Sequence, residues 1–380
     1  MACVGTWSVV VALPAIQDEF HLARSGASFP YTMTMVGFAL GGFSMGRVAD
    51  RFGMAAPIVI GALCLCAGYA IAALAPNVAV FALAHLLLIG FGASAGFAPL
   101  MADLSHWFVR YRGFAVTVAA TGSYMAGALW PQLIQNAIAT YGWRHTHFGL
   151  GLLAPAFLLP MSLLFLRRPL AQAEAAADRA SEAARGTLGL SASALQWLLV
   201  LAGFGCCMAM SMPQVHLVAY CGDLGYGAAR GAEMLSLMLA LGIVSRLASG
   251  AVSDRIGAAT TLLIGSFMQA VALFLYLWFD GLASLYVISG LFGLFQGGIV
   301  PMYTVIIRTY LPAREAGARV GMVMMATVLG MACGGYTSGL IFDMFASYRM
   351  AFLNGLMWNL VNLVVIAWLV ARPTKRALPA

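Results

Sequence analysis

Charged side chains are scarce in this sequence. Asp, Glu, Lys and Arg make up 9% of its 380 residues, whereas a soluble domain has about 25%. The scarcity excludes a water-soluble fold, because a chain that is 62% hydrophobic cannot cover its apolar surface with so few polar groups. We therefore expect the lipid bilayer to be its solvent. Only helices and closed barrels satisfy their backbone there, and the long, unalternating apolar runs favour helices.

Other absences narrow the function further. Lys375 is the only lysine, so the net charge of +7 comes from arginines in short segments between apolar runs, not on one face, which excludes a nucleic-acid partner. The seven cysteines lie almost all inside apolar runs without zinc-ligand spacing, so we expect no metal and no cofactor. Paired carboxylates and nucleophile–base sets are missing from these runs, so we expect no enzyme.

What the sequence does contain is a series of twelve apolar runs. They predict an all-α integral membrane protein with twelve transmembrane helices, near residues 1–16, 29–49, 56–75, 78–102, 113–139, 148–166, 195–220, 231–252, 258–279, 283–307, 315–341 and 349–371. Residues 167–193 form the one long polar segment. We predict a cytoplasmic linker there, joining a six-helix bundle over 1–166 to a second over 194–380.

The first run has sixteen residues before Gln17, fewer than the roughly 20 that a spanning helix needs. It has no basic segment and no cleavage site typical of a signal peptide. We therefore expect that helix 1 is truncated at its start.

The distribution of basic residues predicts the orientation. With the N-terminus inside, fifteen of the twenty Lys and Arg residues fall in cytoplasmic segments and four outside. We therefore predict a multi-pass protein of the plasma or inner membrane with both termini cytoplasmic.

One segment occurs twice, 204 residues apart: "GRVADRFG" begins at Gly46 and "GAVSDRIG" at Gly250. The echo predicts two parallel repeats related by pseudo-symmetry. Each aspartate follows an apolar run and precedes a glycine turn, where a carboxylate can cap a neighbouring helix and pair with arginine. We predict a cytoplasmic gate in which these acids face basic residues of the other half; the alternative is that they only anchor loops. The predicted gate consists of Asp50 and Arg51 near Arg314 and Arg319, and Asp254 and Arg255 near Arg110 and Arg112.

These two segments resemble the loop signatures of the major facilitator superfamily, although Met54, Ala55 and Ala56 replace the usual basic residue. The resemblance implies a fold of two six-helix bundles that work by alternating access. A narrower resemblance lies in "WFVRYRGFAVTVAATG", Trp107–Gly122, which is similar to the helix 5 signature of monocarboxylate transporters. Tyr111 and Thr117 depart from that signature.

Arg246 is the single basic residue placed well inside an apolar run. It lies eight residues before Asp254, so about 12 Å from the cytoplasmic end and close to the midplane. A charge there costs at least about 2.5–3.5 kcal/mol and usually faces a substrate or ion path. Because guanidinium matches a carboxylate in two parallel hydrogen bonds, we predict an anion site; an ion pair inside the bundle or a helix-end anchor is the alternative.

The resemblance implies the same role, since an arginine in this stretch anchors the substrate carboxylate in monocarboxylate transporters. Many members carry an aspartate one turn earlier for proton coupling, where this sequence has Gly242. The helix 1 lysine of some members is absent too. A single intramembrane cation favours a monoanion over a dianion.

Further polar residues at membrane depth are candidates for the same pathway. His216 and His85 could carry protons, because histidine titrates near physiological pH; buried packing is the alternative. We predict that His216 lies toward the outer side. Side chains that could complete the substrate site are Tyr124, Gln296 and Tyr303, each of which is also ordinary in a bundle interior.

The leading prediction is a monomeric secondary transporter that carries a small organic anion, such as lactate or pyruvate, together with protons. A drug or metabolite exporter of the same fold is the first alternative. A non-transporting metabolite sensor is the second. Membrane lipid is the remaining expected partner.

Overall fold

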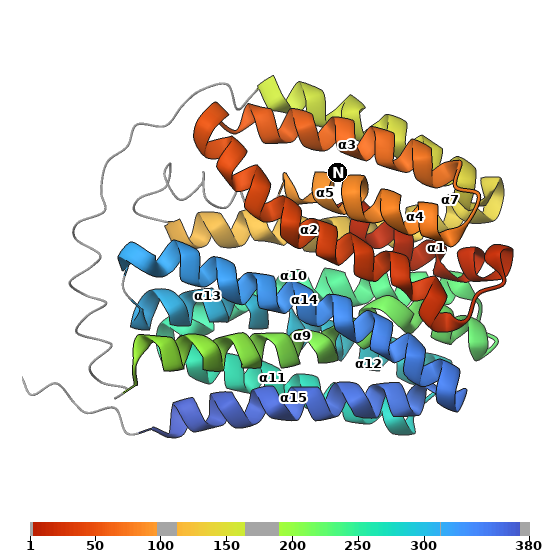
Figure 1. The fold of residues 1–380 in the computed structure, drawn as a ribbon. Coiled ribbons are helices and arrows are strands. Elements are labelled where there is room, and N and C mark those ends of the chain that lie inside the picture. Colours follow the sequence, from red (N-terminus) through yellow and green to blue (C-terminus); the bar gives the residue numbers. More distant parts are fainter. Residues whose placement is uncertain (1–2, 97–111, 164–189, 312, 373–380) are drawn as a thin grey trace, which may run out of the picture.

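The computed structural model describes residues 3–96, 112–163, 190–311 and 313–372, and within these every regular element is helical (Figure 1). The elements are α1 (Val4–Phe20), α2 (Arg24–Phe52), α3 (Ala55–Ala73), α4 (Val78–Ala84), the π-helical turn η1 (His85–Gly90), α5 (Phe91–Ser94), α7 (Arg112–Ser162), α9 (Ala192–Asp223), α10 (Ala228–Ile256), α11 (Ala258–Trp278), α12 (Leu282–Gln296), α13 (Ile299–Tyr310), α14 (Ala313–Phe345) and α15 (Tyr348–Ala371).

The predicted all-helical class is confirmed. Seven spans in the described part of the chain are long and apolar enough to cross a membrane. The number of twelve spans stays a prediction. The runs at 113–139 and 148–166 both lie in α7, which consists of two helices that meet at a kink at Gly142, where φ is 77°. Glycine tolerates that conformation, so the connection between the two helices is shorter than the gap between the two runs.

The first helix also ends later than predicted. Gln17, Asp18 and Glu19 remain helical, and α1 ends at Phe20, followed by His21 in left-handed geometry with φ of 48°. Glu19 in this last turn is bound by α7. Its carboxylate accepts hydrogen bonds from Trp143 Nε1 at 2.5 Å and from Arg144 Nη2 at 2.7 Å.

The echoed segments have the same local structure. α2 ends at Gly53 and α10 at Gly257, with φ of 83° and 85°. Each glycine N–H donates to the carbonyl four residues earlier, on Ala49 at 2.8 Å and on Ser253 at 2.9 Å. The repeat seen in the sequence is therefore a structural repeat, with a positive-φ turn that requires glycine in each copy.

The two halves meet mainly along two pairs of helices, α2 with α14 and α7 with α10, and α1 also contacts α9 and α10. α2 and α14 lie side by side where α2 begins and diverge toward the end where it stops (Figure 1). In the described residues the halves are therefore in contact at the end where α2 begins, the Arg24 end, and α2 and α14 lie apart at the end of the two glycine turns.

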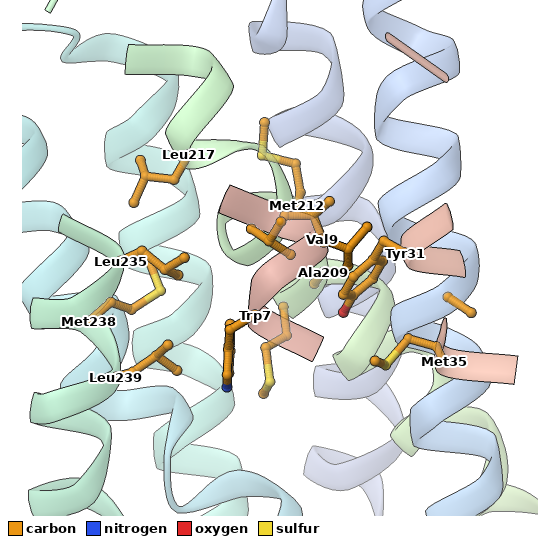
Figure 2. Packing of buried hydrophobic residues seen from close by; sticks show 14 of the residues in the cluster. Trp7, Val9, Tyr31, Met35, Ala209, Met212, Leu217, Leu235, Met238 and Leu239 are labelled. Atoms are coloured by element: carbon orange, nitrogen blue, oxygen red, sulfur yellow. The ribbon is translucent and has the colours of Figure 1, made fainter. Parts of the chain in front are cut away.

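An apolar cluster fills the contact between the halves (Figure 2). Trp7 of α1 lies between α7 and α10: a Cβ on Gly127 would come 2.7 Å from its ring and 2.5 Å from Leu239. Tyr31 and Met35 of α2 are fully or almost fully buried on the other side of the cluster. Burial of these large side chains stabilises the closed contact between the halves.

Candidate functional site

The site begins with a break between α12 and α13. Gly297 and Gly298 separate the two helices, and Pro301 follows four residues after Gly297. Proline has no N–H, so the Gly297 carbonyl lacks its normal helical partner. Arg246 of α10 supplies the missing donor, with Nε 3.1 Å from this oxygen. The sequence thus creates an acceptor inside the bundle and places a guanidinium against it.

Arg246 also reaches across to the other half of the molecule. Its Nη1 donates to the Ala120 carbonyl of α7 at 2.8 Å, and its guanidinium carbon lies 4.3 Å from the centre of the Tyr124 ring. The residue is only 5% exposed. Arg246 is therefore a buried link between α10 and α7, held by two main-chain oxygens and an aromatic face.

These contacts hold the charge of Arg246 without neutralising it. Carbonyls and a ring face carry no full negative charge, and within the described residues no carboxylate pairs with this arginine. A guanidinium has five N–H donors, of which the two backbone bonds use two. Buried cations are normally paired, because desolvation without a counter-charge is costly. An oxyanion would satisfy both the charge and the remaining donors.

The packing explains why position 242 is glycine. A Cβ on Gly242 would lie 2.4 Å from Cε1 of Tyr124, so the tyrosine ring occupies the space of a side chain there. The space that a side chain at position 242 would occupy is therefore filled by an aromatic ring from the other half. Tyr124 and Gly242 form one structural unit with Arg246.

Gln296, the next predicted site residue, precedes the helix break. Its Oε1 accepts a hydrogen bond from Gln214 Nε2 at 2.8 Å, while its own Nε2 is buried with no hydrogen-bond partner. An unpaired buried donor costs about 1–3 kcal/mol, so an acceptor at this point would be stabilising. Gln214 was not predicted; a glutamine in an apolar run directly after Pro213 was the available signal.

Tyr303 has a different environment. Its hydroxyl donates to Asn362 Oδ1 at 2.7 Å, and the Asn362 amide donates to Ser266 Oγ at 2.8 Å. This fully buried network joins α13, α15 and α11 within the C-terminal half. Tyr303 therefore packs inside the C-terminal half, and in the described residues it does not contact Arg246.

His216 also has two partners. Its Nε2 lies 2.8 Å from the Gly335 carbonyl, which can only accept, so Nε2 carries the hydrogen. Its Nδ1 lies 3.3 Å from the Tyr348 hydroxyl and accepts from it. The ring thus joins α9 to α14 and α15 as a neutral, satisfied group. Through Tyr348 it borders the charged cluster at the Arg24 end, which is described next.

Ionic contacts close the Arg24 end. Arg24 Nη2 lies 2.7 Å from Asp223 of α9, and its guanidinium carbon lies 5.0 Å from the Phe342 ring centre. Asp343 of α14 accepts the backbone N–H groups of Arg24 at 2.7 Å and Ser25 at 2.9 Å. A carboxylate of one half thereby caps the N-terminus of α2 in the other. We call Arg24, Asp223 and Asp343 the Arg24 lock. It was not predicted, although all three residues stand at helix ends.

Comparison with known sequences decides the family. The sequence profile of the Major Facilitator Superfamily matches residues 1–292 and 234–380, which together cover the whole chain. The chain belongs to this superfamily. It is a multi-pass membrane protein of a transporter family, and such a family implies a small-molecule substrate.

Relatives in the superfamily include several kinds of transporter. The MFS-type transporter YcxA of Bacillus subtilis is 27% identical over 346 residues, covering 87% of this chain and 82% of YcxA. Monocarboxylate transporter 11 of Homo sapiens is 27% identical over 365 residues, covering 91% and 75%. Monocarboxylate transporter 13 of Bos taurus is 26% identical over 308 residues, covering 80% and 71%.

Solved structures show the same fold. A bacterial homologue of the human lysosomal transporter Spinster, in an inward-facing and occupied conformation, aligns with a TM-score of 0.76 at 12% identity, covering 100% of this chain and 96% of that one. A mutant of the nucleoside transporter NupG aligns with a TM-score of 0.74 at 13% identity, covering 97% and 96%.

The gate predicted from the superfamily loop signatures is described only in part. The side chains of Asp50, Arg110, Arg112 and Arg314 lie outside the described residues. Arg51, Asp254 and Arg255 are exposed at the ends of α2 and α10. Arg319 Nη1 lies 3.5 Å from the Ala192 carbonyl, at the start of α9. The cross-half pairing of these residues stays a prediction.

His85 lies apart from Arg246. It stands at the first position of η1 in the N-terminal half, fully buried, with Nδ1 2.9 Å from the Phe81 carbonyl. The described contacts connect it to residues of α4 and α7, not to α10. Its role in proton coupling stays a prediction.

Proposed function

We propose that the transporter carries a small organic anion, a monocarboxylate of the size of lactate or pyruvate, bound at Arg246. The observation that carries the proposal is a buried guanidinium between the halves with no carboxylate partner among the described residues. A substrate carboxylate would accept the free N–H groups and neutralise the charge. Binding at a contact between the halves also couples the substrate to their relative motion.

The surroundings of Arg246 support a small monoanion as the substrate. One cation balances one negative charge. Tyr124 lies over the guanidinium, and Gln296 beside the break offers an unused amide donor for a hydroxyl or keto oxygen. The names of the two monocarboxylate transporters at 26% and 27% identity support the same class.

The two ends of the bundle open in turn, which gives the substrate access from one side of the membrane at a time. With the basic-residue bias as a guide, the end of the glycine turns is cytoplasmic, both termini are inside, and the Arg24 end faces outward in the plasma or inner membrane. This structure is then closed outward and separated inward. In the opposite state the cytoplasmic gate, Asp50 and Asp254 with their arginines, holds the inner ends together. The transporter acts as a monomer and moves a proton with each monoanion.

Uptake into proteoliposomes tests this function. Radiolabelled lactate or pyruvate should accumulate at least fivefold over protein-free vesicles when the outside is more acidic, and a neutral amide analogue should not. Succinate should compete weakly, because a second carboxylate has no second cation to meet. Equal uptake of the amide analogue, or no carboxylate uptake under any gradient, would refute the proposal.

We expect Tyr124 to contribute to substrate binding through its aromatic ring and not through its hydroxyl. Tyr124→Ala removes the aromatic face and the packing against Gly242, so we expect the apparent KM for the carboxylate to rise about tenfold, the size of a desolvated cation–π contact of roughly 1.4 kcal/mol. Tyr124→Phe keeps the ring and should stay within about twofold. The initial rate of uptake as a function of substrate concentration measures both, and equal losses in the two variants would assign the effect to the hydroxyl.

A further inference from the structure

A pair of buried glutamines joins α9 to α12 beside the helix break. Gln214 and Gln296 are 3% and 0% exposed. Gln214 Nε2 donates to Gln296 Oε1 at 2.8 Å, and this bond fixes the orientation of the Gln296 amide, because only the oxygen of an amide accepts. The amide nitrogen of Gln296 is therefore held in place, and it is buried without a hydrogen-bond partner.

Other buried amides of the same half have acceptors for their nitrogens. Gln269 Nε2 donates to the Cys206 carbonyl at 3.3 Å, and Asn359 Nδ2 donates to the Ser266 carbonyl at 2.8 Å. In the described part of the C-terminal half, Gln296 alone has a buried amide nitrogen with no acceptor. Buried donors are almost always satisfied, so we expect a bound molecule to bring the missing acceptor.

Close packing of α12 on α10 determines the level of this nitrogen in the bundle. A Cβ on Gly293 would lie 1.9 Å from the Met238 carbonyl, and a Cβ on Gly297 would lie 2.1 Å from the Gly242 carbonyl. The number of residues between the two members is the same in both pairs, so the helices run parallel and in register here. Gln296, one residue before Gly297, is therefore level with the residue before Gly242.

The Gln296 amide and the Arg246 guanidinium lie at neighbouring levels. Leu241, which is level with Gln296, stands five residues, or about 7.5 Å, before Arg246 in α10. Helical side chains point back toward the start of their helix, so the Arg246 side chain extends toward the level of Gln296. Its Nε meets the carbonyl of Gly297, the residue that follows Gln296. A small molecule with its carboxylate on Arg246 can therefore extend toward the Gln296 nitrogen.

The chemistry at this point favours an oxygen that carries no hydrogen. Gln296 Oε1 already accepts from Gln214, and the Gly297 carbonyl already accepts from Arg246. A keto oxygen only accepts, so it satisfies the Nε2 donor and brings no new demand. A hydroxyl oxygen also accepts, but its own O–H needs an acceptor. A methylene group leaves the donor unpaired, and a site built around a hydrogen bond rejects a ligand that cannot make it.

We infer that Gln296 is a specificity-determining residue that binds the keto oxygen of a 2-oxo acid and selects it over 2-hydroxy acids and over unsubstituted short-chain acids. The inference rests on the proposed function, because it assigns the second contact of the anion held by Arg246. Gln214 is a positioning residue: it does not touch the substrate but holds the Gln296 amide with its nitrogen available. Arg246 thus determines that an acid is carried, and Gln296 determines which acid.

Pyruvate, lactate and propionate test the inference, because these three-carbon monoanions differ only at carbon 2, which is a keto, a hydroxyl or a methylene group. In proteoliposomes, kcat/KM of the unmodified protein should be about tenfold higher for pyruvate than for propionate, with lactate between them. Gln296→Met keeps the length of the side chain and removes the amide, so the pyruvate-to-propionate ratio should fall to within about twofold of one. The control is Gln269→Met, which removes a fully buried amide that pairs with Cys206 and should leave the ratio unchanged.

Gln214→Met tests the positioning role and also decides the question if Gln296→Met does not fold. It frees Gln296 Oε1 to accept from a hydroxyl group, so kcat/KM for lactate should rise about threefold relative to pyruvate. Three results overturn the inference while the proposed function stands: equal kcat/KM for pyruvate and propionate in the unmodified protein, an unchanged ratio of these two acids in Gln296→Met, or an unchanged lactate-to-pyruvate ratio in Gln214→Met. Uptake of none of the three acids by the unmodified protein overturns the proposed function, and the inference with it.

Discussion

Arg246→Gln should reduce carboxylate uptake at least a hundredfold. The substitution removes the buried positive charge and most of the donors that would meet the substrate, and truncating one partner of a buried charge pair costs about 2–5 kcal/mol. Each 1.4 kcal/mol is a factor of about ten in affinity. Arg246→Lys keeps a charge but loses the planar fork, so we expect a loss of about ten- to thirtyfold, seen mainly in KM. Initial rates in proteoliposomes measure both variants.

A matched control lies on the same helix. Arg230, at the start of α10, is exposed and pairs with Glu233 at 2.8 Å. Arg230→Gln removes the same charge from α10 without touching the site and should leave uptake within twofold. Thermal unfolding of the purified variants separates lost binding from lost folding. Uptake by Arg246→Lys and Arg246→Gln at the rate of the unmodified protein would show that the guanidinium is a packing group and not an anchor.

Asp223→Asn should open the Arg24 end. Arg24 is only 6% exposed and would be left with a neutral partner, so the closed state loses about 1.4–2 kcal/mol and the open population rises ten- to thirtyfold. A Ser28→Cys reporter measures this change. Ser28 is fully buried where α2 meets α14, with its Oγ 2.7 Å from where a Cβ on Gly339 would lie. The rate of labelling of this thiol by a membrane-impermeant maleimide, followed by peptide mass spectrometry, should rise by the same factor.

Arg230→Gln again provides the comparison. It breaks an ion pair that lies on the surface, where such pairs contribute about 0–1 kcal/mol, so the labelling rate should change less than threefold. Asp343→Asn should act in the same direction as Asp223→Asn, because it removes the carboxylate that caps α2. Slow labelling in both lock variants, no faster than with the reporter alone, would mean that apolar packing and not charge holds this end closed.

Sequence reasoning located Arg246 because a charge in an apolar run is costly and therefore conspicuous. It could not find what holds that charge. The partners are the carbonyls of Ala120 and Gly297, which every residue type carries, and the fold alone brings them to the guanidinium. The proline that frees Gly297 was visible in the sequence, but its consequence depends on the neighbour that approaches.

Contacts between residues far apart in the chain could not be predicted from the sequence either. Nothing local indicates that Tyr124 fills the space at Gly242, 118 residues away, or that Arg24 meets Asp223. The helical class and the repeat were predictable, since they follow from composition and from local turns at Gly53 and Gly257.

The main-chain cradle around Arg246 has a consequence for how specificity could be redesigned. A carbonyl at position 120 is present whichever side chain stands there, so the anchor keeps its orientation while its neighbours vary. A library that randomises positions 120 and 296 would therefore explore new substrate shapes around a constant charge. Selection on such a library should yield carriers of larger or more polar carboxylates before it yields carriers of neutral compounds.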